Sequence, residues 1–276
     1  MRPIPRSRPD RGWLCETFPY VRVGDGPRTM LVVPGIGDAM FDGEYSRSVA
    51  WAFRTSLAAF RDEFTIYMVS RPRGLDEGTS VRELACEYGR VLEEVGPASV
   101  VGVSMGGLIA QELARERSDS VSRLAVVVAG SRLAPDCRPR IRRHRELALE
   151  GKLAAIQTDL VRETFTGWRR AIAPWLSRAV GTVRPPYPAD RRDLVVSIDA
   201  VLAFDGRDRL GDVDVPTLVV GGTDDLFFPE SILRETHAAI PDARLALFHG
   251  ARHGPFLEYK AAFDRLMGRF LDGKLD

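Results

Sequence analysis

The sequence predicts an α/β fold: a mostly parallel central sheet with helices on both faces and an inserted helical cap. Three observations predict it. Short apolar runs alternate with amphipathic helical patterns along most of the 276 residues, which are enough for one large domain. These runs are apolar on both faces, as parallel strands are when helices cover both sides. Between residues 132 and 211 the alternation stops and only helical patterns remain.

The first half of the chain supplies the alternating elements in order. We expect strands over residues 13–15, 20–23, 29–33, 65–69, 99–103 and 124–128. Apolar residues at helical spacing indicate helices over 49–60 and 80–95, and a further helical run follows residue 103 at once. Ser80 with Glu83 three residues later is typical of a capping box at a helix start.

The strand and helix order resumes after the interruption. Apolar runs at 216–220 and 245–248 indicate two more strands, with a helix over 232–239 between them. One apolar stripe predicts a single terminal helix, and it consists of Phe256, Tyr259, Phe263, Leu266 and Phe270. Because one alternating series continues on both sides of the interruption, the interruption is a cap inserted into one sheet.

The interrupting segment has its own helices and its own charge. We expect helices over 140–150, 153–165, 168–180 and 194–204, the last two separated by Pro185, Pro186 and Pro188. Residues 132–210 carry 16 Arg or Lys against 10 Asp or Glu, whereas the rest of the chain carries 23 against 28. The predicted organisation is a flexible arm (1–11), a core (12–131 and 212–276) and a cap (132–211).

Composition argues against several classes of function. A net charge of +1 gives no reason to expect nucleic-acid binding, and no run approaches the roughly 20 apolar residues of a membrane span. The charged first residues lack the apolar stretch of a secretory signal. Cys15, Cys86 and Cys137 are odd in number and lack metal-ligand spacing, which indicates reduced thiols. We therefore expect a cytoplasmic protein without metal or cofactor, and the oligomeric state stays open.

The most informative segment is Gly-Val-Ser-Met-Gly at residues 102–106, between a predicted strand and a predicted helix. In this context the motif Gly-x-Ser-x-Gly is a nucleophile elbow. Glycine at Gly102 and Gly106 removes side chains that would collide in so tight a turn. Ser104 would then present its hydroxyl at a helix N-terminus, which favours developing negative charge. The alternative is an ordinary serine in a glycine-containing turn.

A serine nucleophile needs a base within hydrogen-bond reach. His253 is the best candidate, because it lies in a glycine-flanked loop between the last strand and the last helix, and such loops often carry catalytic groups. His249, still at the strand's edge, is the second candidate. We expect His144 to be a solvated helix residue in a basic run, and His237 to be a surface or partly packed residue of its helix.

The base needs an acid that orients it. Asp224 and Asp225 follow the strand at 216–220, where one of them can be catalytic and the other can cap a turn or the next helix. The order Ser104, then one of these aspartates, then His253 is the order of α/β-hydrolases.

From about residue 13 to 271 the chain resembles the α/β-hydrolase superfamily with a helical cap between core strands six and seven. The acid loop of that family often reads Gly-x-x-Asp-x-x-x-Pro, which Gly222, Asp225 and Pro229 match. Its histidine often follows a glycine by three residues, as His253 follows Gly250. The resemblance therefore implies Ser104 as nucleophile, His253 as base and Asp225 as acid.

The resemblance also implies an oxyanion loop after the strand at 29–33, with donors at the N–H groups of Ile36 and Met105. The family's His-Gly-x-Gly is here Pro-Gly-Ile-Gly at 34–37, which keeps the backbone donors and loses the histidine side chain. Relatives commonly carry Asp-x-x-Gly-x-Gly after strand four, whereas this chain has Ser-Arg-Pro-Arg-Gly at 70–74. We expect Arg71 and Arg73 to form salt bridges at this turn and to take no catalytic part.

The leading function is a cofactor-free serine hydrolase that cleaves a carboxylic ester or thioester of a small, partly apolar molecule through an acyl-enzyme. A serine at position 104 argues against dehalogenase and epoxide-hydrolase chemistry, which use an aspartate there. The same triad serves a carbon–carbon bond hydrolase, an aminopeptidase-like amidase and an acyltransferase. A catalytically silent small-molecule receptor is the alternative from another class.

The sequence says least about the substrate. Gly35 is expected near the pocket. Large apolar residues of the cap could line the pocket, or they could pack the cap onto the core. These cap residues are Phe165, Trp168, Trp175, Leu176 and Tyr187. The basic run at 138–145 is expected to be a solvated helix face, although it could attract an acidic substrate or carrier.

Overall fold

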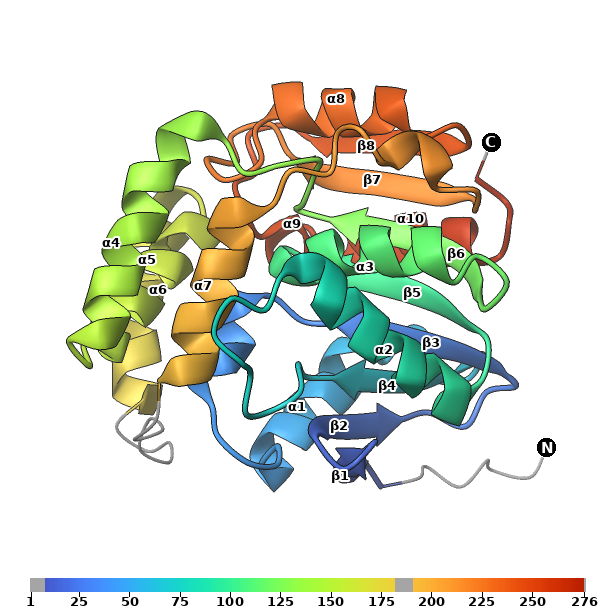
Figure 1. The fold of residues 1–276 in the computed structure, drawn as a ribbon, viewed down its shortest axis with the longest axis horizontal. Coiled ribbons are helices and arrows are strands. Elements are labelled where there is room, and N and C mark those ends of the chain that lie inside the picture. Colours follow the sequence, from blue (N-terminus) through green and yellow to red (C-terminus); the bar gives the residue numbers. More distant parts are fainter. Residues whose placement is uncertain (1–7, 182–190, 276) are drawn as a thin grey trace.

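A computed structural model describes residues 8–181 and 191–275, and it contains one eight-stranded sheet in the order β1-β2-β4-β3-β5-β6-β7-β8. The first two pairings are antiparallel and the other five are parallel. The strands are β1 (Asp10–Leu14), β2 (Phe18–Val23), β3 (Arg28–Val33), β4 (Phe64–Val69), β5 (Ala98–Val103), β6 (Val121–Val127), β7 (Thr217–Gly222) and β8 (Ala243–Phe248). The predicted fold class is confirmed, with helices around the sheet (Figure 1).

Two apolar clusters form the core, one on each face of the sheet. In β3, Leu31 and Val33 belong to the first cluster, and Met30 and Val32 belong to the second, because successive side chains of a strand point to opposite faces. The first cluster is covered by α2 (Val81–Val95), α3 (Met105–Glu116) and α8 (Glu230–Ala239), and the second by α1 (Arg47–Ser56) and α10 (Lys260–Leu271). The capping box of Ser80 and Glu83 is present at the start of α2.

Among the described residues, four α-helices lie between β6 and β7, in the segment predicted as the cap. They are α4 (Arg138–Leu149), α5 (Leu153–Thr164), α6 (Gly167–Gly181) and α7 (Arg192–Ala203). Figure 1 shows them gathered at one end of the sheet. The prolines at 185, 186 and 188 lie outside the described residues.

The structure differs from the sequence-based expectations at both ends of the chain. Asp10 and Arg11, placed in the flexible arm, already pair with β2 as part of β1, and residues 1–7 lie outside the described residues. The expected single terminal helix is two helices, α9 (Pro255–Glu258) and α10, because Tyr259 adopts φ −112° and ψ 35° between them.

The basic run of α4 is only in part the solvated face that its composition suggested: Arg142 and Arg143 are exposed, whereas three other arginines bond to neighbouring helices. Arg140 donates to Asp159 of α5 at 2.7 Å, Arg145 to Asp199 of α7 at 2.7 Å, and Arg138 to the Leu202 carbonyl at 2.7 Å. These charges therefore hold the cap helices together.

The expectation that His144 is solvated is also wrong. Its side chain is buried, and its Nε2 lies 2.7 Å from Asp159 Oδ2. Periodicity on a single helix could not reveal this, because the partner lies on the next helix.

None of the helices in the described part of the chain has the length and apolarity that crossing a membrane requires. Cys15, Cys86 and Cys137 are free thiols.

Candidate active site

The parallel strands bring four loops to one edge of the sheet, since β3, β5, β7 and β8 run in the same direction within the order β3-β5-β6-β7-β8. The loop after β3 carries Ile36, and the turn after β5 carries Ser104. The loops after β7 and β8 carry Asp225 and His253. Residues up to 217 positions apart in the sequence (36 and 253) therefore meet at one site.

Ser104 occupies a strained turn between β5 and α3. Its φ of 55° lies in the left-handed region, which a non-glycine residue rarely adopts. A Cβ on Gly102 would collide with the Gly106 carbonyl oxygen, and a Cβ on Gly106 would collide with that of Val33. Glycine is therefore required at both positions, for the steric reason that the motif suggested.

Ser104, His253 and Asp225 form one hydrogen-bonded line. His253 Nε2 lies 2.9 Å from Ser104 Oγ, and His253 Nδ1 lies 2.7 Å from Asp225 Oδ2. The Asp225 side chain is fully buried, and the other oxygen of its carboxylate accepts the backbone N–H groups of Phe227 (2.8 Å) and Phe228 (3.2 Å). These bonds hold the carboxylate in a fixed orientation toward the imidazole.

The other candidates for base and acid lie elsewhere. Asp224 is exposed, and its carboxylate accepts a hydrogen bond from Thr223 at 3.0 Å. His249 is exposed, and His237 is half-buried on α8. In the described residues only His253 connects Ser104 to a carboxylate.

Groups that the sequence analysis did not single out hold the imidazole in place. The His253 ring packs edge-on against Phe227 (centroids 4.9 Å apart) and lies nearly parallel to Phe228 (6.2 Å). Its backbone N–H donates to the Glu163 carbonyl of α5 at 3.1 Å. The sequence could have pointed to Phe227 and Phe228, because they lie two and three residues after Asp225. Nothing in the sequence near residue 163 pointed to the site.

The predicted oxyanion donors lie beside Ser104. A Cβ built on Gly35 would lie 3.2 Å from Ser104 Cβ, so this loop passes directly against the serine. Met105 is the first residue of α3, where backbone N–H groups have no helical partner. Within the described residues, neither the Ile36 N–H nor the Met105 N–H makes a hydrogen bond.

The expectation for Arg71 is wrong. Its side chain is buried, and it donates to the carbonyl groups of Pro34, Gly35 and Ile36. Among residues 8–181 and 191–275, Arg71 makes no ion pair with a carboxylate. The side chain thus packs against the loop after β3 rather than at a surface turn.

Ser104 opens into a narrow apolar cavity of about 30 Å3. Core loops and cap helices both contribute to it. The lining residues are Ile36, Ser104, Met105, Leu133, Ile141, Leu160, Val201, Phe227, Phe228 and His253.

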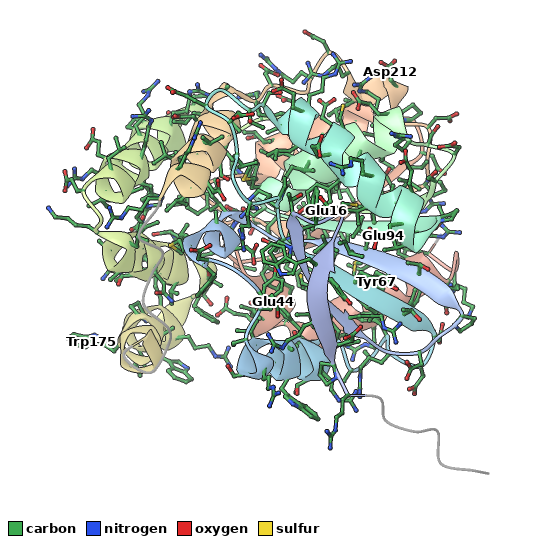
Figure 2. The ribbon with its side chains drawn as sticks, turned by 60° about the horizontal axis from the view of Figure 1, so that its bottom comes forward. Glu16, Glu44, Tyr67, Glu94, Trp175 and Asp212 are labelled. Atoms are coloured by element: carbon green, nitrogen blue, oxygen red, sulfur yellow. The ribbon has the colours of Figure 1, made fainter. Side chains whose placement is uncertain are left out.

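The cap aromatics expected at the pocket do not line this cavity. Trp168 is 69 % exposed and Trp175 is 72 % exposed, and Figure 2 shows Trp175 at the outer edge of the cap. Phe165 is half-buried. Tyr187 and the Leu176 side chain lie outside the described residues. The cap contributes aliphatic residues of α4, α5 and α7 to the lining. The exposed tryptophans lie on α6, whose described residues contribute none.

Comparison with known proteins places this geometry in a family. The sequence is 29% identical over 191 residues to a pimeloyl-[acyl-carrier protein] methyl ester esterase of Neisseria meningitidis, covering 65% of this chain and 59% of that protein. It is 30% identical over 270 residues to the polyketide synthase ThaQ of Burkholderia thailandensis, covering 92% of this chain and 12% of that protein. The chain thus spans less than two thirds of either relative.

The fold has close counterparts among solved structures. The enol-lactonase from Burkholderia xenovorans superimposes with a TM-score of 0.77 at 20% identity, covering 95% of this chain and all of that one (100%). The model of the alpha/beta hydrolase family matches residues 30–266. This protein therefore belongs to the alpha/beta hydrolase family.

Proposed function

We propose that this protein is a serine hydrolase that cleaves a carboxylic ester or thioester of a small, partly apolar molecule through an acyl-enzyme. The hydrogen-bonded line from Ser104 through His253 to Asp225 carries the proposal. The methyl ester esterase among the curated relatives supports ester-bond hydrolysis.

In the first half-reaction His253 Nε2 takes the Ser104 proton while Oγ attacks the acyl carbon. The carbonyl oxygen becomes an oxyanion, which we expect the N–H groups of Ile36 and Met105 to bind. Asp225 holds the Nδ1–H of the imidazole and stabilises its charged form. The intermediate then collapses, and the alcohol or thiol leaves with the proton from His253.

In the second half-reaction a water molecule gives a proton to His253 and attacks the acyl carbon of the ester to Ser104. The carboxylic acid leaves, and the proton returns to Ser104.

The cavity lining supports an apolar acyl group. Apart from Ser104 and His253, every side chain that lines it is apolar. No charged group there would compensate a charged or strongly polar acyl chain, whose burial without partners is costly. We therefore expect short or medium aliphatic acyl groups to be preferred over acyl groups that carry a carboxylate.

The test is hydrolysis of p-nitrophenyl esters and acyl thioesters of increasing chain length, together with labelling by a fluorophosphonate. Hydrolysis and labelling of the parent, both absent in Ser104→Ala, would support the proposal. A folded parent that binds an ester without turnover and resists the phosphonate would instead be a silent receptor.

A further inference from the structure

Arg71 lies beneath the loop that carries Ile36, and its side chain is 1 % exposed. Its Nη1 donates to the carbonyl oxygens of Pro34 (3.3 Å) and Gly35 (3.2 Å). Its Nη2 donates to those of Gly35 (3.3 Å) and Ile36 (3.5 Å). A buried cation is costly without polar partners, and here three consecutive backbone carbonyls supply them. Within the described part of the chain, the hydrogen bonds of the guanidinium therefore all go to this loop.

The bonds to Gly35 determine which way the next peptide faces. The described residues contain no cis peptide bond, and in a trans peptide the C=O and N–H groups point in opposite directions. Since the Gly35 carbonyl faces Arg71, the Ile36 N–H faces away from Arg71. Ile36 lines the cavity together with Ser104, whereas Arg71 does not.

We propose that Arg71 is a positioning residue that directs the Ile36 N–H toward the oxyanion formed when Ser104 attacks the acyl group. This inference rests on the proposed ester hydrolysis. The N–O distances exceed the usual value of about 2.9–3.0 Å, so the orienting effect comes from several acceptors acting together. The buried positive charge also polarises the Gly35–Ile36 peptide, which makes its N–H a stronger donor.

Arg71 shares this task with Asp38. The Asp38 N–H also donates to the Gly35 carbonyl at 3.2 Å. The Asp38 carboxylate in turn accepts the hydroxyl groups of Tyr45 (2.7 Å) and Ser70. Without Arg71 the loop therefore keeps one anchor, and the peptide gains freedom to rotate. We expect a loss smaller than that from deleting an oxyanion donor, about 10- to 100-fold in kcat.

The experiment compares Arg71→Met, Arg71→Lys and the control Arg73→Met. Arg71→Met should lower kcat by about 10- to 100-fold and change KM little. Its affinity for a trifluoromethyl ketone, which forms a tetrahedral adduct with Ser104, should fall in parallel with kcat/KM. Arg71→Lys should lose less, because it keeps the charge. Arg73 lies in the same turn, and among the described residues its side chain makes no hydrogen bond to the loop. Arg73→Met should therefore behave like the parent.

Crystal structures of the parent and Arg71→Met supply a readout that does not depend on activity. We expect the Gly35–Ile36 peptide to be rotated or to occupy two orientations in the variant. An unchanged peptide, or parental kcat and inhibitor affinity in the folded variant, would overturn the inference. If Arg71→Met does not fold, Arg71→Lys decides by the same readouts. If the parent hydrolyses no ester, the proposed function fails, and the peptide orientation still decides the role of Arg71.

Discussion

Arg252 and Glu163 join the loop that carries His253 to helix α5. The Arg252 guanidinium binds the Glu163 carboxylate, and the next residue, His253, donates its backbone N–H to the Glu163 carbonyl at 3.1 Å. The Glu163 side chain is 2 % exposed and also accepts Arg140 of α4 at 2.8 Å. One residue of α5 therefore fixes the backbone of the proposed base and ties it to a second cap helix.

Replacing Glu163 by glutamine should destabilise the fold and lower turnover. Breaking a buried ion pair costs about 3–5 kcal/mol, and we expect about 3 kcal/mol here because Arg140 and Arg252 keep some exposure. Urea unfolding monitored by circular dichroism measures the loss. The matched control is Glu146→Gln, which removes an exposed partner of Arg143 on α4 and should cost at most about 0.5 kcal/mol. Equal losses in the two variants would contradict a special role for Glu163.

Low pH should weaken the ion pairs of Glu163 and of Asp159. Burial opposes ionisation of Glu163, but the hydrogen bond from Arg252 and the charge of Arg140 outweigh it and lower the pKa of this carboxyl below its usual 4.5. Burial likewise opposes ionisation of Asp159, whose pKa is lowered by hydrogen bonds from His144 and Arg140. Because the folded pKa values lie below the unfolded ones, both groups stabilise the fold above their unfolded pKa values. This contribution is lost progressively as the pH falls below about 4.5.

The measurement is the free energy of unfolding as a function of pH for the parent and Glu163→Gln. The parent should lose stability more steeply than the variant on acidification below about pH 4.5, since the variant lacks one of the two carboxyls. Parallel curves would show that Glu163 does not contribute to the pH dependence.

Ser104→Ala should abolish hydrolysis with the fold intact, since loss of a triad serine costs on the order of 10⁶ in turnover. Alanine at this position keeps the Cβ that the strained turn already accommodates. Initial rates with a p-nitrophenyl ester and a thermal unfolding curve test this prediction. Substantial turnover by the folded variant would remove Ser104 from the mechanism.

Asp225→Asn should damage turnover far more than Asp224→Asn. The amide retains an oxygen for the N–H groups of Phe227 and Phe228, so the loop is expected to stay in place. Its NH2 group disfavours the productive tautomer of His253, which in a serine protease cost about 10⁴. Asp224 is exposed and makes no contact with the imidazole among the described hydrogen bonds. A comparison of kcat for the two variants decides, and a larger loss at Asp224 would reverse the assignment.

Substrate preference should depend on the aliphatic lining of the cap rather than on its exposed tryptophans. Val201→Ala and Leu160→Ala enlarge the cavity and should favour longer acyl chains, because one methylene in an apolar pocket changes specificity about 10- to 200-fold. Trp168→Ala and Trp175→Ala are the controls and should keep the parental ranking. Profiles of kcat/KM against chain length test this. If only the tryptophan variants change the ranking of acyl chains, α6 rather than the aliphatic lining determines substrate preference.

Local chemistry made much of this protein predictable from its sequence. The elbow at Ser104 depends on glycines two residues away on either side, and the start of α2 depends on Ser80 and Glu83, three residues apart. The alternation of apolar runs predicted the parallel sheet, because each run carries its own periodicity. The grouping of Ser104, an aspartate and His253 was predicted from strand ends and chain order. The residues alone did not decide between Asp224 and Asp225 as the acid.

Only the tertiary structure decided which side chains from distant elements meet. Arg71 lies under a loop about 35 positions earlier, and His144 is buried against Asp159 of the next helix. Neither contact leaves a local pattern, so both residues looked like ordinary surface groups. The same reason applies to the pocket: burial of Val201 and exposure of Trp175 depend on how the cap helices pack on the core. Residue type and helical spacing do not determine that packing, because it arises between elements rather than within them.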